Sequence, residues 1–68
     1  MKRSILTKRE QEIFALLVRG RTTREIAKIV GISEKTVRNH ISNAMQKLEV
    51  KGRASAVVEL LRLGEITL

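Results

Sequence analysis

The chain has 68 residues, enough for one small domain, and it carries 14 Lys and Arg against 7 Asp and Glu, a formal net charge of +7. The absence of Cys excludes disulfides and thiolate metal sites, and a single His is too few for a zinc finger. No apolar run approaches the roughly 20 residues of a membrane span. The charge favours a polyanionic partner, and association with a second copy would help to stabilise so small a core.

The first predicted helix covers residues 8–19. Thr7 and Glu10 form a capping box, in which each side chain accepts a hydrogen bond from the backbone N–H of the other residue. Ile5 or Leu6 can pack onto the first turn, and Gly20 ends the helix. The residues predicted to face inward are Ile13, Phe14 and Leu17. Glu10 has no acid or base partner in the local pattern, so we interpret it as structural and not catalytic.

The second predicted helix covers residues 23–30 and begins with another capping box, Thr22 to Glu25. Its inward residues are Ile26, Ala27 and Val30. The exposed N–H groups of a helix N-terminus attract phosphates, so its first turn is a candidate contact with a nucleic-acid backbone. The alternative interpretation is that this turn only caps the helix.

The third predicted helix covers residues 34–48, after Gly31 in a left-handed turn and Ser33 as N-cap. The spacing of Ala27, Gly31 and Val37 lets two short helices cross closely and predicts a helix-turn-helix, whose second helix enters a DNA major groove. One stripe of that helix is apolar and faces the core: Val37, Ile41, Ala44, Met45 and Leu48.

The opposite stripe of residues 34–48 is polar. It consists of Lys35, Asn39, Ser42, Asn43 and Gln46, flanked by Arg38 and Lys47, and it has no acid after Glu34. Amides, hydroxyls and cations are the groups that hydrogen-bond base edges and phosphates. An ordinary solvated face, the alternative, would mix Glu with Lys. Thr36 could reach a phosphate, and His40 is either a half-buried, hydrogen-bonded histidine or a phosphate contact.

The fourth predicted helix covers residues 53–63, before Gly64, and it is apolar on too many sides for a monomer. The residues expected to face the domain are Arg53, Ala56, Val57, Leu60 and Leu63. Those expected to point elsewhere, with Leu61 outside the core, are Ala54, Val58, Leu61 and Glu65. We predict that this second set forms the interface of a homodimer. The alternative is a helix wrapped by its own domain.

Several blocks of the sequence together resemble the LuxR/FixJ-type DNA-binding domain. They are LTKRE at 6–10, Gly20, EIA at 25–27, GISEKTVRNH at 31–40, KL at 47–48 and Arg53 with Ala56 and Val57. The spacing between the blocks is kept and nearly the whole chain is covered. SEKTVRNHISNAMQKL, VKGR and AVVELLR look closer still to small sporulation regulators of this family. The chain departs from the family at Glu49, commonly a small residue, and at Gly52, usually a capping Ser or Asp.

The resemblance implies an all-α, compact four-helix domain spanning 1–68, which dimerises through its last helix and activates and represses late sporulation genes. It also implies base contacts at Arg38, Asn39 and Ser42, and the helical projection independently exposes Asn39 and Ser42. With the projection, the predicted base contacts are Arg38, Asn39, Ser42 and Asn43. The predicted DNA-backbone contacts are Thr22, Thr23, Arg24, Lys35, Thr36, His40, Gln46 and Lys47.

A sequence-specific transcription regulator is the function that the sequence favours. A nonspecific architectural DNA-binding protein and an adaptor for an acidic protein surface are the alternatives, and the amides of residues 34–48 argue against the first of them. We expect double-stranded DNA and a second copy as partners, with RNA polymerase a further candidate. We expect no catalytic residue, cofactor, metal, small-molecule ligand or membrane contact, and a location in the bacterial cytoplasm on the nucleoid. Most relatives join this domain to a receiver or ligand-sensing domain. We expect this chain to have no such domain, and its activity to be set by expression level or partners.

Overall fold

The computed structural model describes residues 5–68 and contains, within that range, four helices and no strand. The helices are α1 (Lys8–Leu17), α2 (Thr23–Val30), α3 (Glu34–Leu48) and α4 (Arg53–Arg62). The predicted all-α, four-helix fold is confirmed. α1 ends two residues earlier than expected and α4 one residue earlier, because turns begin at Val18 and Leu63. The first four residues of the predicted domain lie outside the described residues.

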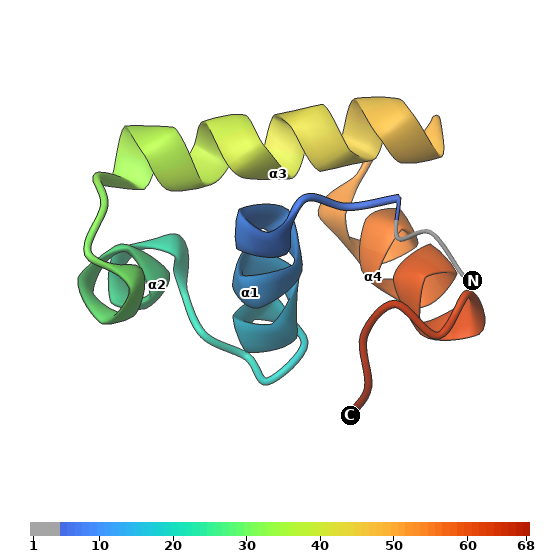
Figure 1. Cartoon of the computed structure of the whole chain (residues 1–68), viewed down its shortest axis with the longest axis horizontal. Coiled ribbons are helices and arrows are strands. Elements are labelled where there is room, and N and C mark those ends of the chain that lie inside the picture. The colour runs from blue at the N-terminus through green and yellow to red at the C-terminus, as the bar shows by residue number, and fades with distance from the viewer. Residues whose placement is uncertain (1–4) are drawn as a thin grey trace.

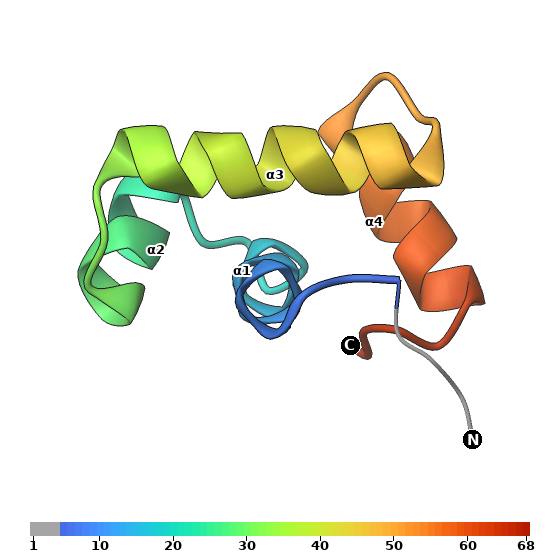
Figure 2. The same ribbon diagram turned by 45° about the horizontal axis from the view of Figure 1, so that its top comes forward.

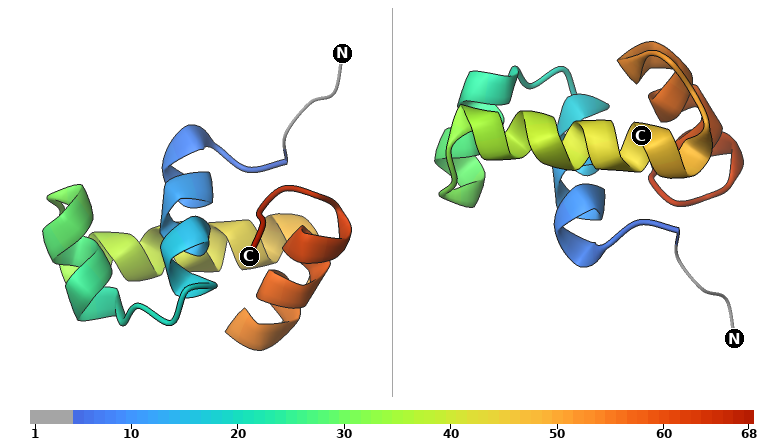
Figure 3. Two further views of the ribbon diagram at one scale, coloured as in Figure 1. Left: turned by 90° about the horizontal axis from the view of Figure 1, so that it is seen from below. Right: turned by 90° about the horizontal axis from the view of Figure 1, so that it is seen from above.

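α3 is the longest helix and lies across one side of the molecule, where it contacts the other three helices (Figure 1). α2 packs beneath its N-terminal end, α1 beneath its middle and α4 beneath its C-terminal end (Figure 2). Seen from above, α3 lies in front of the other helices along its whole length (Figure 3, right). One face of α3 is therefore held by the domain, and no other helix covers the opposite face.

Local capping sets where three of the helices begin. Thr7 and Glu10 exchange hydrogen bonds of 3.1 and 2.9 Å, as do Thr22 and Glu25, so both predicted capping boxes are confirmed. Ser33 Oγ accepts the N–H of Thr36 at 3.1 Å and caps α3. α4 has Gly52 as its N-cap residue and no side-chain cap, as the departure from the family pattern predicted.

The core lies where α3 crosses the other helices. Its largest fully buried side chains are Phe14, Ile13, Ile26, Ile41, Leu60 and Val37. Other predicted core residues, such as Leu17 and Met45, are only partly buried but pack against this cluster. The prediction for Arg53 was wrong: it is the first residue of α4, before the inward stripe begins, and its side chain is exposed.

The segment after α4 completes the core, which the sequence did not indicate. The chain turns at Gly64 and runs back toward α1 (Figure 1), and Ile66 is buried. Gln11 Nε2 on α1 donates a hydrogen bond of 2.8 Å to the carbonyl oxygen of Glu65. Residues 65–66 therefore tie the C-terminal segment to the start of the domain.

A residue in the left-handed region follows each helix. It is glycine after α1, α2 and α4, at Gly20, Gly31 and Gly64, but after α3 it is Glu49, with φ 56°. Glycine adopts this conformation without the steric cost that a Cβ imposes, and a negative charge at a helix C-terminus is also unfavourable. The chain is therefore strained at the end of α3.

Replacing Glu49 with Gly is expected to stabilise the domain. The substitution removes the backbone strain and the unfavourable charge, but glycine also has more freedom in the unfolded chain. We therefore expect the free energy of unfolding to rise by about 0.5–1 kcal/mol. For a domain of this size that raises the thermal midpoint by about 3–6 °C. Thermal unfolding followed by circular dichroism measures this, with Glu49→Gln as the control that removes only the charge. An equal gain from Gln would show that relief of the backbone strain brings no net stabilisation.

Candidate nucleic-acid interface

The outer face of α3 is a continuous exposed surface of polar and cationic side chains. All four predicted base-contact residues lie on it and are exposed: Arg38, Asn39, Ser42 and Asn43. Lys35, Gln46 and Lys47 are exposed as well, whereas Thr36 and His40 are half-buried at its edges. α1, α2 and α4 pack beneath α3, so no other helix covers this face (Figure 3).

The N-terminal end of this face adjoins cations from α2. A shallow hollow of about 480 Å³ is lined by Arg24, Ala27, Lys28, Gly31, Ile32, Ser33 and Glu34. Arg24 was a predicted backbone contact, and the structure adds Lys28, one turn further along α2, to the same hollow. The helical period would have predicted Lys28 here, because residues four apart, such as Arg24 and Lys28, lie on the same face of a helix. The Thr22 hydroxyl accepts the capping hydrogen bond from Glu25 N–H, and the Thr36 hydroxyl shares a hydrogen bond with the Ser33 hydroxyl.

Two ion pairs among residues 5–68 involve α3. Arg38 Nη1 lies 3.6 Å from Glu34 Oε1, one turn earlier on the same helix, and both side chains are about half exposed. Lys47 Nζ lies 2.6 Å from Glu10 Oε1 on α1, and the Glu10 side chain is almost entirely buried. The first pair lies on the outer face, and the second joins α3 to the start of α1.

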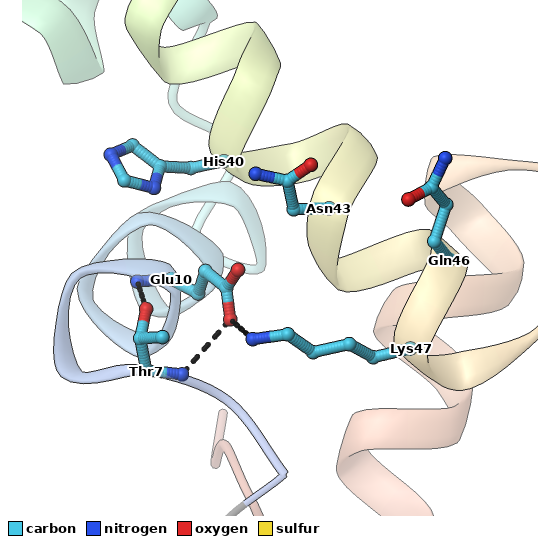
Figure 4. A pocket seen from close by; sticks show the side chains of 6 residues that line it. All are labelled: Thr7, Glu10, His40, Asn43, Gln46 and Lys47. Atoms are coloured by element: carbon cyan, nitrogen blue, oxygen red, sulfur yellow. Dashed lines mark hydrogen bonds and ion pairs between the residues drawn. The ribbon is translucent and has the colours of Figure 1, made fainter.

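Figure 4 shows the second pair at the edge of a hollow of about 550 Å³ between the start of α1 and α3. The hollow is lined by Thr7, Glu10, His40, Asn43, Gln46 and Lys47. Lys47 was predicted to contact a phosphate, but its ammonium here neutralises Glu10. His40 is half-buried, as its structural interpretation expected, yet no hydrogen bond to its ring is present in the described part of the chain.

The charge of Glu10 depends on this pairing. Burial raises the pKa of its carboxyl, but hydrogen bonds from Lys47 and the Thr7 amide, with the charge of Lys47, outweigh burial and leave the pKa below its ordinary value of 4.5. Glu10 is therefore ionised in the folded domain at neutral pH. This confirms a structural role for Glu10 within the capping box and adds a second role as the anchor of Lys47.

The pairing of Glu10 with Lys47 makes the stability of the domain depend on pH. The pKa of Glu10 is lower in the folded domain than in the unfolded chain. Its contribution to folding stability is therefore fully present above about pH 4.5 and is lost as the pH falls through the folded pKa. We expect the urea midpoint of Glu10→Gln to fall less steeply below pH 4.5 than that of the natural chain. Glu12→Gln, which alters an exposed carboxylate, is the control. Identical acid profiles for Glu10→Gln and the natural chain would contradict the pairing.

The outward face of α4 is partly apolar. Ala54 and Val58 are exposed, as predicted, but Leu61 is half-buried and packs against the core, so its placement outside the core was wrong. Glu65 does not continue this stripe, because α4 ends at Arg62 and the chain reverses at Gly64. The exposed apolar part of the face therefore centres on Val58.

No three His, Cys, Asp or Glu side chains within residues 5–68 gather closely enough to hold a metal ion. None of its helices is long and apolar enough to cross a membrane.

A helix-turn-helix whose second helix exposes a face of amides, hydroxyls and cations defines a DNA-binding domain. The family model for bacterial regulatory proteins of the luxR family matches residues 4–60. The chain belongs to this family, and it is a DNA-binding transcription regulator, not an enzyme.

Individual relatives agree with this assignment. The chain is 72% identical over 64 residues to the spore germination protein GerE of Bacillus subtilis (strain 168), covering 94% of this chain and 86% of that protein. It is 48% identical over 60 residues to the transcriptional regulatory protein DegU of Brevibacillus brevis, covering 88% of this chain but 25% of DegU. A solved structure of the transcription factor GerE superimposes with a TM-score of 0.93 at 63% identity, over 96% of this chain and 97% of that one.

Proposed function

We propose that this protein binds specific DNA sites as a homodimer, with α3 of each copy in a major groove. The observation that carries the proposal is the outer face of α3, which is exposed along its length and has no acid after Glu34. Major-groove readout requires donors and acceptors that reach base edges, and this face supplies them from a helix held firmly from below.

The side chains divide by what they can reach. Arg38, Asn39, Ser42 and Asn43 read base edges from the centre of the face. The groups that position the domain on the DNA backbone are Thr22, Thr23, Arg24, Lys35, Thr36, His40, Gln46 and Lys47, to which we add Lys28 from the α2 hollow. The half-buried residues at the edges contribute only where the backbone passes close to them.

We infer the biological setting from the similarity to the spore germination protein GerE. The regulated genes are those expressed late in sporulation, including genes for spore-coat proteins, some activated and others repressed. The protein acts on nucleoid DNA in the bacterial cytoplasm, and activation involves contact with RNA polymerase.

Selection of bound sites from random DNA tests this function. A dimer of this kind should return a symmetric site whose half-sites lie about one helical turn, ~34 Å, apart. In competition, the selected site should be preferred over unrelated DNA by a factor on the order of 10³ or more. Absence of any preferred sequence would favour a nonspecific architectural protein, and absence of DNA binding would favour an adaptor for acidic proteins.

Affinity for DNA is expected to fall steeply with salt, because each phosphate neutralised by a cation releases counterions. The logarithm of the binding constant should fall with the logarithm of salt concentration with a slope of about −0.9 per phosphate contacted. Arg24→Ala should make this slope shallower by about 1. Titrations at several salt concentrations measure it, with Arg62→Ala as control, since Arg62 lies on α4 and pairs with Glu59. An unchanged slope for Arg24→Ala would remove Arg24 from the interface.

A further inference from the structure

One acid lies on the helix that otherwise presents amides and cations. Glu34 is the first residue of α3, and it is the only Asp or Glu in that helix. It is exposed, and its carboxylate lies 3.6 Å from the guanidinium of Arg38, one turn later. A negative charge here would repel the phosphates on either side of a major groove, so its presence on this face requires a reason.

Helix stability supplies one ordinary reason. A carboxylate in the first turn interacts favourably with the positive end of the helix dipole, by a few tenths of a kcal/mol at an exposed site. That reason would apply equally if Arg38 were any other residue. It does not account for the ion pair between Glu34 and Arg38.

On DNA, Arg38 could contact either a phosphate or the edge of a base. A long exposed cation binds any phosphate within reach, and such contacts raise affinity without reading sequence. A guanine edge, in contrast, needs the guanidinium held in one orientation so that two N–H groups meet O6 and N7. Arg has five N–H donors in a fixed fork, so a carboxylate can hold the group while two donors remain free for the base.

We propose that Glu34 is a positioning residue for sequence specificity, whose carboxylate holds Arg38 for a guanine edge and weakens its capture by phosphates. This inference rests on the proposed function, since it requires Arg38 to contact a base. Holding the side chain before binding reduces the ordering cost on the cognate site, while the negative charge opposes binding to every phosphate. Glu34 thereby raises the ratio of specific to nonspecific affinity.

The test compares four variants on the selected site and on an unrelated duplex of equal length, at one salt concentration. Glu34→Gln removes the charge, and Glu34→Asp keeps the charge but shortens its reach by one methylene. Arg38→Ala removes the proposed base contact. Glu12→Gln is the control, because Glu12 pairs with Arg9 at the same 3.6 Å on α1 and its removal changes the net charge equally.

We expect Glu34→Gln to bind unrelated DNA more tightly and to lower the specificity ratio by about 3- to 10-fold, the size of ordering one long side chain. Glu34→Asp should lose the part of the ratio that depends on positioning Arg38, while binding unrelated DNA like the natural chain. Glu12→Gln should keep the ratio.

Three results would overturn the inference. If Arg38→Ala lowers the ratio but Glu34→Gln does not, the base contact stands and positioning by Glu34 is wrong. If Glu34→Asp keeps the natural ratio while Glu34→Gln loses it, charge alone acts. If Arg38→Ala leaves the ratio unchanged, the proposed base contact fails and the inference fails with it. Thermal unfolding of each variant checks that α3 is intact.

Discussion

Replacing Val37 with Asp is expected to leave the domain largely unfolded at pH 7. Val37 has no solvent exposure and lies in the core where α3 packs on the rest of the domain. Burying an unpaired carboxylate there costs several kcal/mol, whether the group stays charged or is forced to take up a proton. A domain of this size is stable by only about 3–10 kcal/mol, so one such change consumes most of its stability.

Far-ultraviolet circular dichroism and thermal unfolding measure this effect. Asn39→Asp is the matched control, because it places the same carboxylate two residues along α3 at an exposed position. That variant should melt close to the natural chain while binding DNA more weakly. A cooperative melt of Val37→Asp within a few degrees of the natural chain would mean that the inward stripe of α3 is wrongly assigned.

The elements that the sequence predicted correctly depend on neighbouring residues. Both capping boxes, the Ser33 cap and the left-handed Gly31 act within four positions of the chain, and all are present in the structure. The outer face of α3 was also predictable, because a helical projection needs only the helix and its period. It separated exposed Asn39 and Ser42 from buried Val37 and Ile41 before any tertiary structure was known.

The features that the sequence did not predict join distant parts of the chain. The projection placed Lys47 beside the polar stripe, but it could not show that Glu10, 37 positions earlier, lies within 2.6 Å of its ammonium. Nor could it show that residues 65–66 fold back on α1, where Glu65 meets Gln11, 54 positions away. Extending the stripe of α4 to Glu65 failed for the same reason, since a helical period has no meaning beyond the turn at Gly64.

These long-range contacts change how substitutions at Lys47 and Leu61 would be interpreted. Lys47→Ala would remove a predicted phosphate contact, but it would also leave the buried Glu10 carboxylate without its cation, so a loss of binding could reflect a loss of stability. Leu61→Lys would likewise disturb the core that Leu61 packs against. Variants that test DNA binding or dimerisation must therefore come from residues that are exposed and make no core contact.

Replacing Val58 with Lys is expected to abolish cooperative binding to a full site. Val58 is 58% exposed on the outward face of α4, beside exposed Ala54, and a two-fold pairing would bring this face against its own copy. A lysine there would place two like charges near the dyad. Loss of dimerisation removes the avidity of two linked contacts, which is commonly a factor of 10² to 10⁴, so we expect full-site affinity to fall by about 100-fold or more.

Gel-shift titration on a full site and on one half-site, with sedimentation of the free protein, measures this loss. Ile29→Lys is the matched control: Ile29 is 57% exposed on α2, and the substitution adds the same charge away from α4. Both variants should fold, since neither side chain belongs to the core, and both should bind a half-site about as well as the natural chain. Only Val58→Lys should lose the full-site advantage. If Val58→Lys sediments as a dimer and keeps that advantage, or if Ile29→Lys loses it equally, α4 is not the surface through which two copies meet.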